Sequence, residues 1–246
     1  MLRAVTFDLW QTLIQDTPEG LRQARAGRVR GIHEVLVRHG LAVDLTRVDD
    51  AYDRVGNRME WLWASQQDVG SRGQVRWLLE AVGLESRVPS QGTLMDQLDD
   101  AYCLPILSAL PVTNEGAREV LEALSRRGLP LALICNTGRT PGRMLRLVLD
   151  RLALAPYLRV LTFSDEVGLR KPHPEIFRQT LSALGVAPEE AAHIGDDLTT
   201  DVAGARGIGM RAVHLRPAIG VGRDGDDTEA IPSLHALPAA LFPPSS

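Results

Sequence analysis

The second half of this chain alternates short apolar runs with amphipathic stretches, and this alternation constrains the fold more than any other feature. The apolar runs have the composition of buried strands, whereas the stretches between them carry apolar residues at helical spacing. Strands that alternate with helices form parallel sheets with right-handed crossovers. We expect strands at 131–135, 160–163, 193–194 and 212–215, and helices at 114–127, 144–152, 175–184 and just before 212.

The first half of the chain has a different pattern. A buried strand is expected at 4–8, and a strand-poor section of roughly ninety residues, the size of a small domain, follows it. Thr17 and Pro18 predict the start of a helix that runs toward Gly40. Apolar residues at spacings of three and four predict three more helices, within 48–62, 75–82 and 94–102, and Pro105 is expected to end the last of them.

Together these patterns predict an α/β protein with a doubly wound parallel sheet of five main strands and an inserted helical unit. The expected domains are a sheet domain formed by 1–14 and 109–246 and a helical domain formed by 15–108. The tail is expected to be a loop over 217–228, followed by a short closing helix within 231–241.

Polar residues suited to catalysis lie where the expected strands end. Asp8 ends the first strand, and Cys135 and Asn136 end the second; Lys171 follows the third, and Asp196 and Asp197 follow the fourth. In an open parallel sheet, ligands bind beyond the carboxyl ends of the strands. The sequence therefore predicts one site built from four loops, with the helical unit above it.

Lys171 is the only lysine among 27 basic residues, and Arg170 stands next to it. An ammonium group is compact and rotates freely, whereas a guanidinium is planar and rigid. We interpret the single lysine as a functional cation of the predicted site.

Four segments carry these residues in order: 8–13 (DLWQTL), 134–138 (ICNTG), 171–177 (KPHPEIF) and 194–201 (IGDDLTTD). Together they resemble the four motifs of the haloacid dehalogenase-like hydrolase superfamily, and 171–177 is the most specific of them. The helical unit is similar to the C1-type cap of that family. The resemblance implies a Rossmann-like core and phosphoryl transfer through a covalent aspartyl-phosphate.

The resemblance assigns a role to each residue of the site. Asp8 would be the nucleophile, and Mg²⁺ would bind Asp8, Asp196 and the backbone carbonyl of Trp10. Two carboxylates at neighbouring strand ends also suit Mg²⁺ on chemical grounds alone, because this ion prefers oxygen ligands. Lys171 would neutralise Asp8 and the phosphoryl group.

The remaining motif residues would bind the substrate or support the site. Thr12, Cys135 and Asn136 would bind the substrate together with Lys171. Asp201 and Asp197 would support the site, with Asp201 orienting Lys171 or a metal-bound water. Read without the resemblance, the acidic run 196–201 would be a solvated loop in which Asp201 caps a helix.

Two positions depart from the family's phosphatases. Trp10 stands where they have a second aspartate, which protonates the leaving group and later activates water, and an indole can do neither. Cys135 stands where Ser or Thr is usual, and a thiol is a weaker donor. Thr137 and the backbone of Asn136 are the alternative donors nearby.

Three functions therefore stay open. The favoured one is Mg²⁺-dependent hydrolysis or transfer of a phosphoryl group. The second is a 2-haloacid dehalogenase, because the dehalogenases of this superfamily carry an aromatic residue at the Trp10 position; their metal aspartate is replaced, whereas Asp196 is present here. The third is a catalytically weak binding or regulatory protein.

The charge of the chain limits its partners. A net charge of −4 and a pI near 5.9 argue against a nucleic-acid or acidic-membrane partner. No apolar run reaches spanning length, and the apolar stretch that ends at Asp8 is shorter than a signal peptide, so a cytoplasmic location is expected. The expected partner is a small anionic molecule, a phosphate ester or an acyl phosphate, and the sequence does not indicate an oligomeric state.

One basic run has two interpretations. The expected first helix carries a set of arginines that either point toward an anionic substrate or form a solvated helix face. These residues are Arg22, Arg25, Arg28 and Arg30.

Overall fold

The computed structural model describes residues 1–216 and 229–243 and confirms the α/β fold with an inserted helical region. One sheet has the order β5-β4-β1-β6-β7-β8, and all its neighbouring strands are parallel. Its strands are β1 (Ala4–Phe7), β4 (Leu131–Cys135), β5 (Leu158–Phe163), β6 (Ala191–Gly195), β7 (Arg211–Leu215) and β8 (Ala230–Ile231). The five predicted strands are present, and β8 is a short sixth strand that the sequence did not indicate.

Helices cover both faces of this sheet, as a doubly wound fold requires. The α-helices of this half, within the described residues, are α5 (Ala117–Arg126), α6 (Gly142–Arg151), α7 (Ser164–Val167), α8 (Pro174–Leu184), α9 (Gly204–Arg206) and α10 (Leu237–Leu241). The shorter 3-10 segments are η2 (Ala155–Tyr157), η3 (Pro188–Glu190) and η5 (Leu234–Ala236), and η4 (Leu198–Ala203) is a π-helix.

Alternation along the strands creates two separate cores. Val5 and Phe7 belong to a large core on the α5 and α6 face, whereas Ala4 belongs to a smaller core that contains Phe177 of α8 and Ala205 of α9. Because each core holds one face of the strands, the two cores together fix the orientation of the residues at the strand ends, where the site lies.

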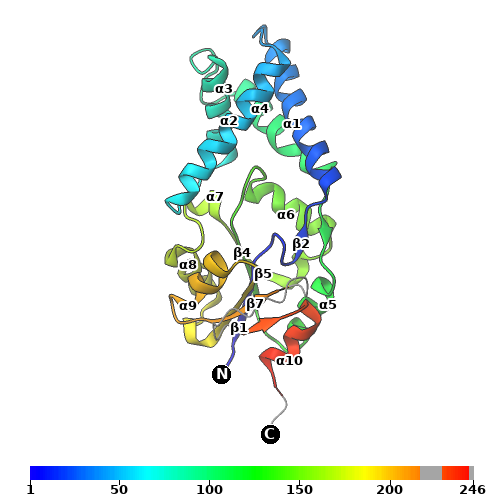
Figure 1. Ribbon diagram of the computed structural model, residues 1–246, viewed down its shortest axis with the longest axis vertical. Helices are drawn as coiled ribbons and strands as arrows, with labels where there is room; N and C mark the ends of the chain where they lie inside the picture. Colours follow the sequence, from blue (N-terminus) through cyan, green and yellow to red (C-terminus); the bar gives the residue numbers. More distant parts are fainter. Residues whose placement is uncertain (217–228, 244–246) are drawn as a thin grey trace.

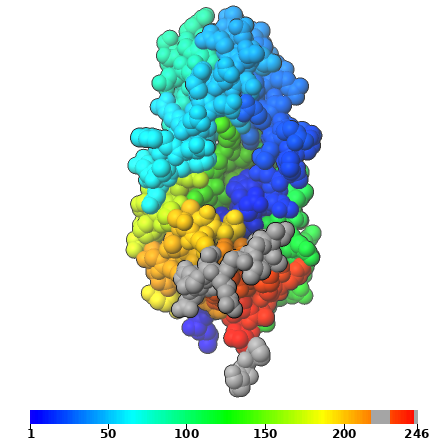
Figure 2. Space-filling model, in the orientation of Figure 1, coloured from blue at the N-terminus to red at the C-terminus, as the bar shows by residue number. Residues whose placement is uncertain are grey.

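Four helices form the insertion between β1 and β4: α1 (Pro18–Arg38), α2 (Leu45–Ala64), α3 (Ser71–Val82) and α4 (Thr93–Cys103), followed by the 3-10 helix η1 (Leu104–Leu107). Thr17 caps α1 as predicted, since its side chain accepts a hydrogen bond from the backbone of Gly20. Figure 1 shows these helices as a bundle above the sheet, and Figure 2 shows that the bundle, in blue through cyan to blue-green, forms one end of the elongated molecule. We call this bundle the cap.

The two chain crossings between the cap and the sheet half lie side by side. Strands β2 (Ile14–Gln15) and β3 (Val112–Thr113) form a two-stranded antiparallel sheet, with Gln15 opposite Val112. Two-residue strands leave no periodic signal, so the sequence did not predict this pairing. The exact limits of the cap domain, 15–108, stay a prediction.

The tail differs from its prediction. The expected closing helix is confirmed only over η5 and α10, because Ile231 belongs to β8 and pairs with Leu215. The predicted loop 217–228 lies outside the described residues. None of the helices in the described ranges is long and apolar enough to cross a membrane.

Candidate active site

The carboxyl ends of three adjacent strands bring the predicted residues together. In the sheet order, β1 lies between β4 and β6, so Asp8 after β1, Cys135 at the end of β4 and Asp196 after β6 lie at one edge. The backbone N–H of Asp8 donates to the carbonyl of Ile194 at 2.8 Å, which holds the first loop against β6. The convergence expected from the sequence is present.

Lys171 lies between two buried carboxylates. Its Nζ donates to Oδ1 of Asp8 and to Oδ1 of Asp201, each at 2.6 Å, and only 1% of its side chain is exposed. Burial disfavours the ammonium, but Asp201 and Asp8 outweigh it and raise the pKa of Lys171. The only lysine of the chain is therefore the charged centre of this site.

Both carboxylate oxygens of Asp201 accept hydrogen bonds. Its Oδ1 also accepts from Nε2 of His193 at 3.1 Å, and its Oδ2 accepts from the backbone of Asp197 at 3.2 Å. Burial opposes ionisation, yet Lys171 and His193 hold the pKa of Asp201 well below its usual range. A Cβ at Gly195 would lie 2.3 Å from Cγ of Asp201, so only glycine lets this carboxyl pack against the end of β6. Asp201 is buried, which excludes its interpretation as a solvated cap.

Asp8, Asp196 and Asp201 can hold a metal ion, since each offers an oxygen within 4.8 Å of the others. Both oxygens of Asp201 accept hydrogen bonds, whereas Asp8 accepts only through Oδ1. Among the described residues, the one side-chain donor to the carboxylate of Asp196 is Thr12 Oγ1, at 3.5 Å. The three carboxylates exceed the charge of Lys171. The donor set therefore suits a divalent cation on Asp8 and Asp196, with Asp201 orienting Lys171.

The pKa values of Asp8 and Asp196 also favour a cation between these two residues. Burial raises the pKa of Asp8 to about 7 and also raises the pKa of Asp196. Both carboxyl groups therefore resist ionisation in the protein alone, and a cation between them would favour the charged forms.

The turn after β1 leaves one carbonyl available. Leu9 O accepts from the backbone of Leu13 and Ile14, and the side chain of Asn114 donates to the carbonyls of Gln11 and Thr12. Trp10 is the remaining residue of the turn 9–12, and within the described residues no hydrogen bond is donated to its carbonyl. Trp10 is partly buried against the core, and its carbonyl stays a predicted metal ligand.

Thr12 and Asp197 lie beside the acidic pair. Thr12 is fully buried, and its predicted contact with a phosphoryl group remains a prediction. Oδ1 of Asp197 accepts from the backbone of Thr199 and Thr200 at 2.8 and 2.7 Å, and so caps η4. Asp197 thus supports the loop that carries Asp196.

The loop after β4 holds Lys171 in place. Asn136 Nδ2 donates to the carbonyl of Lys171 at 3.0 Å, and its Oδ1 accepts from the backbone of Lys171 at 2.8 Å. Cys135 lies on the same face of β4 as Leu131 and Leu133, and burial raises the pKa of its thiol well above the usual value. The predicted substrate contacts of Cys135 and Asn136 remain predictions, whereas the role of Asn136 in positioning Lys171 is visible.

A cavity of about 450 Å³ lies between the cap and the strand ends. Trp10, Asn136 and Thr137 line it on the sheet side. The cap side and the loop after β4 contribute aromatic, charged and hydroxyl groups: Asp16, Arg25, Arg28, Tyr52, Trp63, Arg139 and Thr140, with Arg170 beside them. Asp8 does not line this cavity, but Trp10, two residues after it, does, so the cavity lies next to the strand-end site.

Asp68 connects the cap to the catalytic loops. This cap residue has a completely buried side chain, which accepts from Nη1 of Arg170 at 2.6 Å, from Thr137 Oγ1 at 3.1 Å and from Ser164 Oγ. The adjacent backbone also pairs, because Arg170 N donates to Gln66 O at 2.9 Å. The cap is thereby attached directly to the segment that precedes Lys171.

Sequence reasoning missed three residues of this region. His193 occupies an interior strand position whose only signal was a polar residue in an apolar run, two residues before Gly195. Asp68 and Arg139 have no motif around them, and tertiary packing alone reveals their contacts. His173, the one histidine inside the motifs, caps α8, since its Nδ1 accepts from Glu175 N at 3.2 Å.

Comparison with known proteins agrees with this architecture. The haloacid dehalogenase-like hydrolase family matches residues 2–209. A phosphoserine phosphatase of Thermus thermophilus is 33% identical over 249 residues, which cover 95% of each chain. A glyceraldehyde 3-phosphate phosphatase of Pyrococcus furiosus is 31% identical over 219 residues, covering 87% of this chain and 81% of that protein.

Among solved structures, a 2-haloacid dehalogenase from Pseudomonas syringae pv. Tomato has a TM-score of 0.69 at 23% identity and covers 98% of both chains. At that identity the likeness shows a shared fold and does not choose between substrates. The chain belongs to the haloacid dehalogenase-like hydrolase family of enzymes.

Proposed function

We propose that this haloacid dehalogenase-like hydrolase removes a phosphoryl group from a small anionic molecule through an aspartyl-phosphate on Asp8, with Mg²⁺ as cofactor. The observation that carries the proposal is the surroundings of Asp8. Lys171 Nζ donates to its Oδ1 at 2.6 Å, and an oxygen of the Asp196 carboxylate lies within 4.8 Å of an Asp8 oxygen. A nucleophile that must approach a phosphate anion needs cations at this place. The names of the two phosphatase relatives support a phosphorylated small molecule as substrate.

The reaction would proceed in two displacements. The free oxygen of Asp8 attacks phosphorus, the bond from phosphorus to the leaving oxygen breaks, and the leaving group departs with that electron pair. Water then attacks phosphorus, the bond from phosphorus to the Asp8 oxygen breaks, and the Asp8 carboxylate is regenerated as inorganic phosphate is released. One proton of this water stays on the phosphate and the other balances the charge of the departed leaving group. Lys171 stays between Asp8 and Asp201 and faces the charge that accumulates on the phosphoryl oxygens. Mg²⁺ would supply further positive charge and keep Asp8 ionised.

A 2-haloacid dehalogenase is the second candidate, and the aromatic Trp10 is the observation in its favour. The acidic pair of Asp8 and Asp196 argues against it, because these carboxylates would repel a haloacid in the absence of a metal ion. A panel of phosphate esters and haloacids, assayed with Mg²⁺ and with chelator, decides between the two. Halide release that persists in chelator would overturn the phosphatase proposal. Absence of turnover on every class would favour a binding or regulatory role.

Asp196→Asn should abolish Mg²⁺ binding and phosphatase activity, because it removes the carboxylate that no cation neutralises within the described structure. Isothermal titration with Mg²⁺ measures the binding directly, and chelation of the wild-type enzyme should have the same effect on activity. Asp197→Asn is the matched control, since asparagine caps a helix as well as aspartate. Undiminished activity in chelator, or equal Mg²⁺ binding by Asp196→Asn, would refute the metal site.

The cap should close further over bound ligand, with motion at 15–17 and 105–111. These segments adjoin the β2–β3 pair that joins the two halves, and hinges commonly lie at such element ends. We expect amide hydrogen exchange in both segments to slow when a phosphate analogue binds, whereas α10 at the far end of the sheet half serves as an unchanged control. Exchange that is indifferent to the analogue at both crossings would show that the cap does not move there.

A further inference from the structure

Arg28 is a buried cation without an acidic partner in the described structure. It lies on α1 and lines the cavity, with 6% of the residue exposed. Its Nε donates to the carbonyl of Tyr102 at 3.0 Å, Nη1 to the hydroxyl of Tyr52 at 3.4 Å, and Nη2 to Thr140 Oγ1 at 2.9 Å. All three acceptors are neutral, and the guanidinium lies 5.9 Å from the centroid of the Tyr102 ring. Within the described residues no carboxylate forms an ion pair with Arg28, in a place where a charge is costly.

Arg139 reaches the same cavity from the opposite side. It follows β4, and its Nη1 donates to the hydroxyl of Tyr102 at 3.1 Å, while its Nη2 donates to the carbonyl of Tyr52 at 2.8 Å. Its guanidinium lies 3.6 Å from the centroid of the Tyr52 ring. A Cβ at Gly56 would lie 2.7 Å from Nη2, so this glycine of α2 leaves the space that Arg139 occupies.

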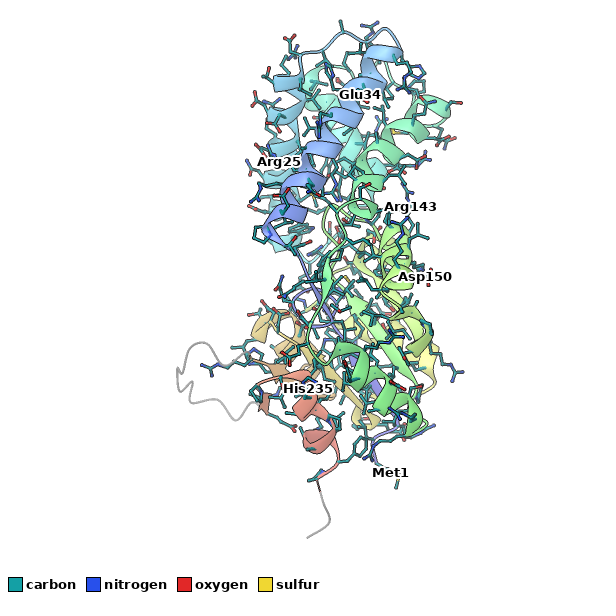
Figure 3. The ribbon with its side chains drawn as sticks, turned by 90° about the vertical axis from the view of Figure 1, so that its right-hand side faces the viewer. Met1, Arg25, Glu34, Arg143, Asp150 and His235 are labelled. Atoms are coloured by element: carbon teal, nitrogen blue, oxygen red, sulfur yellow. The ribbon has the colours of Figure 1, made fainter. Side chains whose placement is uncertain are left out.

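The other two arginines of the cavity are neutralised. Arg25 pairs with Asp49 and Asp53. Figure 3 shows Arg25 on the part of α1 nearer the sheet, with Glu34 farther along the helix. Arg170 pairs with Asp68 at 2.6 Å.

Asp16 is the one acid that lines this cavity within the described residues. Its carboxylate does not form an ion pair with Arg28. Burial raises the pKa of Asp16, with Arg28 acting in the opposite direction. The cap end of the cavity therefore carries more positive than negative charge. Asp8 and Asp196 do not line the cavity; its base is formed by Trp10, two residues after Asp8, and by Asn136, which hydrogen-bonds the backbone of Lys171.

We propose that Arg28 and Arg139 form a second anion-binding subsite, so that the physiological substrate is a phosphate ester carrying a further carboxylate or phosphate. The inference rests on the proposed function for the phosphoryl end of the substrate. Trp10 and Asn136 line the base of the same cavity, so one elongated molecule can contact both ends. Because Arg28 belongs to the cap and Arg139 to the loop after β4, an anion between them would also favour closure.

Two substrates with similar leaving groups test the subsite: 4-carboxyphenyl phosphate and its neutral analogue 4-carbamoylphenyl phosphate. The wild-type enzyme should prefer the carboxylate in kcat/KM by roughly 10- to 100-fold, the range expected for hydrogen bonds to a charged group. Arg28→Gln and Arg139→Gln should each lower this ratio toward one, and Arg28→Lys should restore part of it. The control is Arg30→Gln, which changes an exposed arginine of the same helix that does not line this cavity. Its side chain donates to the carbonyl of Ala26 at 3.3 Å. Hydroquinone bisphosphate, compared with the carboxylate, distinguishes a second phosphate from a carboxylate.

A binding measurement separates this inference from the proposed reaction. 4-(Phosphonomethyl)benzoate and 4-(phosphonomethyl)benzamide are not hydrolysed, so titration calorimetry in Mg²⁺ reports the subsite even if no turnover occurs. Tighter binding of the benzoate to wild type, lost in Arg28→Gln and Arg139→Gln variants of unchanged Tm, supports the subsite. Equal binding of both compounds to the wild-type enzyme, or a preference that survives both substitutions, overturns it. If either Gln variant has a lowered Tm, binding of the two compounds to Arg28→Lys decides. Partial retention of the preference for the benzoate supports recognition by charge, and its complete loss overturns the subsite.

Discussion

Replacement of Asp8 by Asn should abolish turnover, with a loss of roughly 10⁴-fold or more, as expected when the nucleophile of a covalent mechanism is removed. The amide is a poor nucleophile and cannot form the aspartyl-phosphate. The fold should persist, because Lys171 keeps its ion pair with Asp201 at 2.6 Å and the buried carboxyl that is removed has a pKa raised to about 7. Steady-state kinetics and thermal unfolding measure the two effects.

The covalent intermediate gives an independent measurement. An acid quench during turnover should trap phosphate on the peptide that contains Asp8, and fluoroberyllate should add to the same carboxylate. Asp201→Asn is an informative comparison, since it weakens the positioning of Lys171 but leaves the nucleophile, so it should slow turnover and still trap phosphate on Asp8. Activity of Asp8→Asn above background, or phosphate trapped on another residue, would remove Asp8 from this role.

The sheet and its strand-end residues were predictable because local patterns determine them. Buried parallel strands are continuous apolar runs, and parallel topology alone places Asp8, Cys135 and Asp196 at one edge. The motif that follows the third strand predicted that Lys171 approaches Asp8, and in the structure Lys171 Nζ donates to Oδ1 of Asp8 at 2.6 Å. The correct predictions are those for which residues close together in the sequence determine the structure.

Contacts between the cap and the sheet half were not predictable in this way. Asp68 and Arg170 are 102 positions apart, and no local pattern marks either as a partner of the other. The same limit applies to the arginines of α1, whose helical spacing left two interpretations open. The structure divides them: Arg22 and Arg30 are exposed, Arg25 is ion-paired, and only Arg28 is buried at the cavity.

Trp10 should make the rate depend strongly on the leaving group. If no acid at this position protonates a departing alkoxide, the enzyme lacks a contribution that is typically worth ~10² to 10⁴ in rate. Acyl phosphates and p-nitrophenyl phosphate, whose leaving groups depart as stable anions, should therefore react far faster than sugar phosphates. The second displacement should also be slow, because no base at this position activates water, so the first turnover should appear as a burst of released leaving group.

Trp10→Asp should raise the turnover of alkyl phosphates more than that of acyl phosphates and should diminish the burst, and rapid-quench kinetics with both substrate classes measures this. Trp10→Phe is the matched control, since it keeps an aromatic ring against the core without adding an acid. A rate that is independent of leaving-group pKa, together with no burst, would mean that another group supplies the proton. Asp16 is the acid to examine then, because it lines the same cavity as Trp10 and burial raises its pKa, which favours the protonated form that a general acid needs. In that case Asp16→Asn should restore both the leaving-group dependence and the burst, and a lack of effect would place the acid outside the cavity described here.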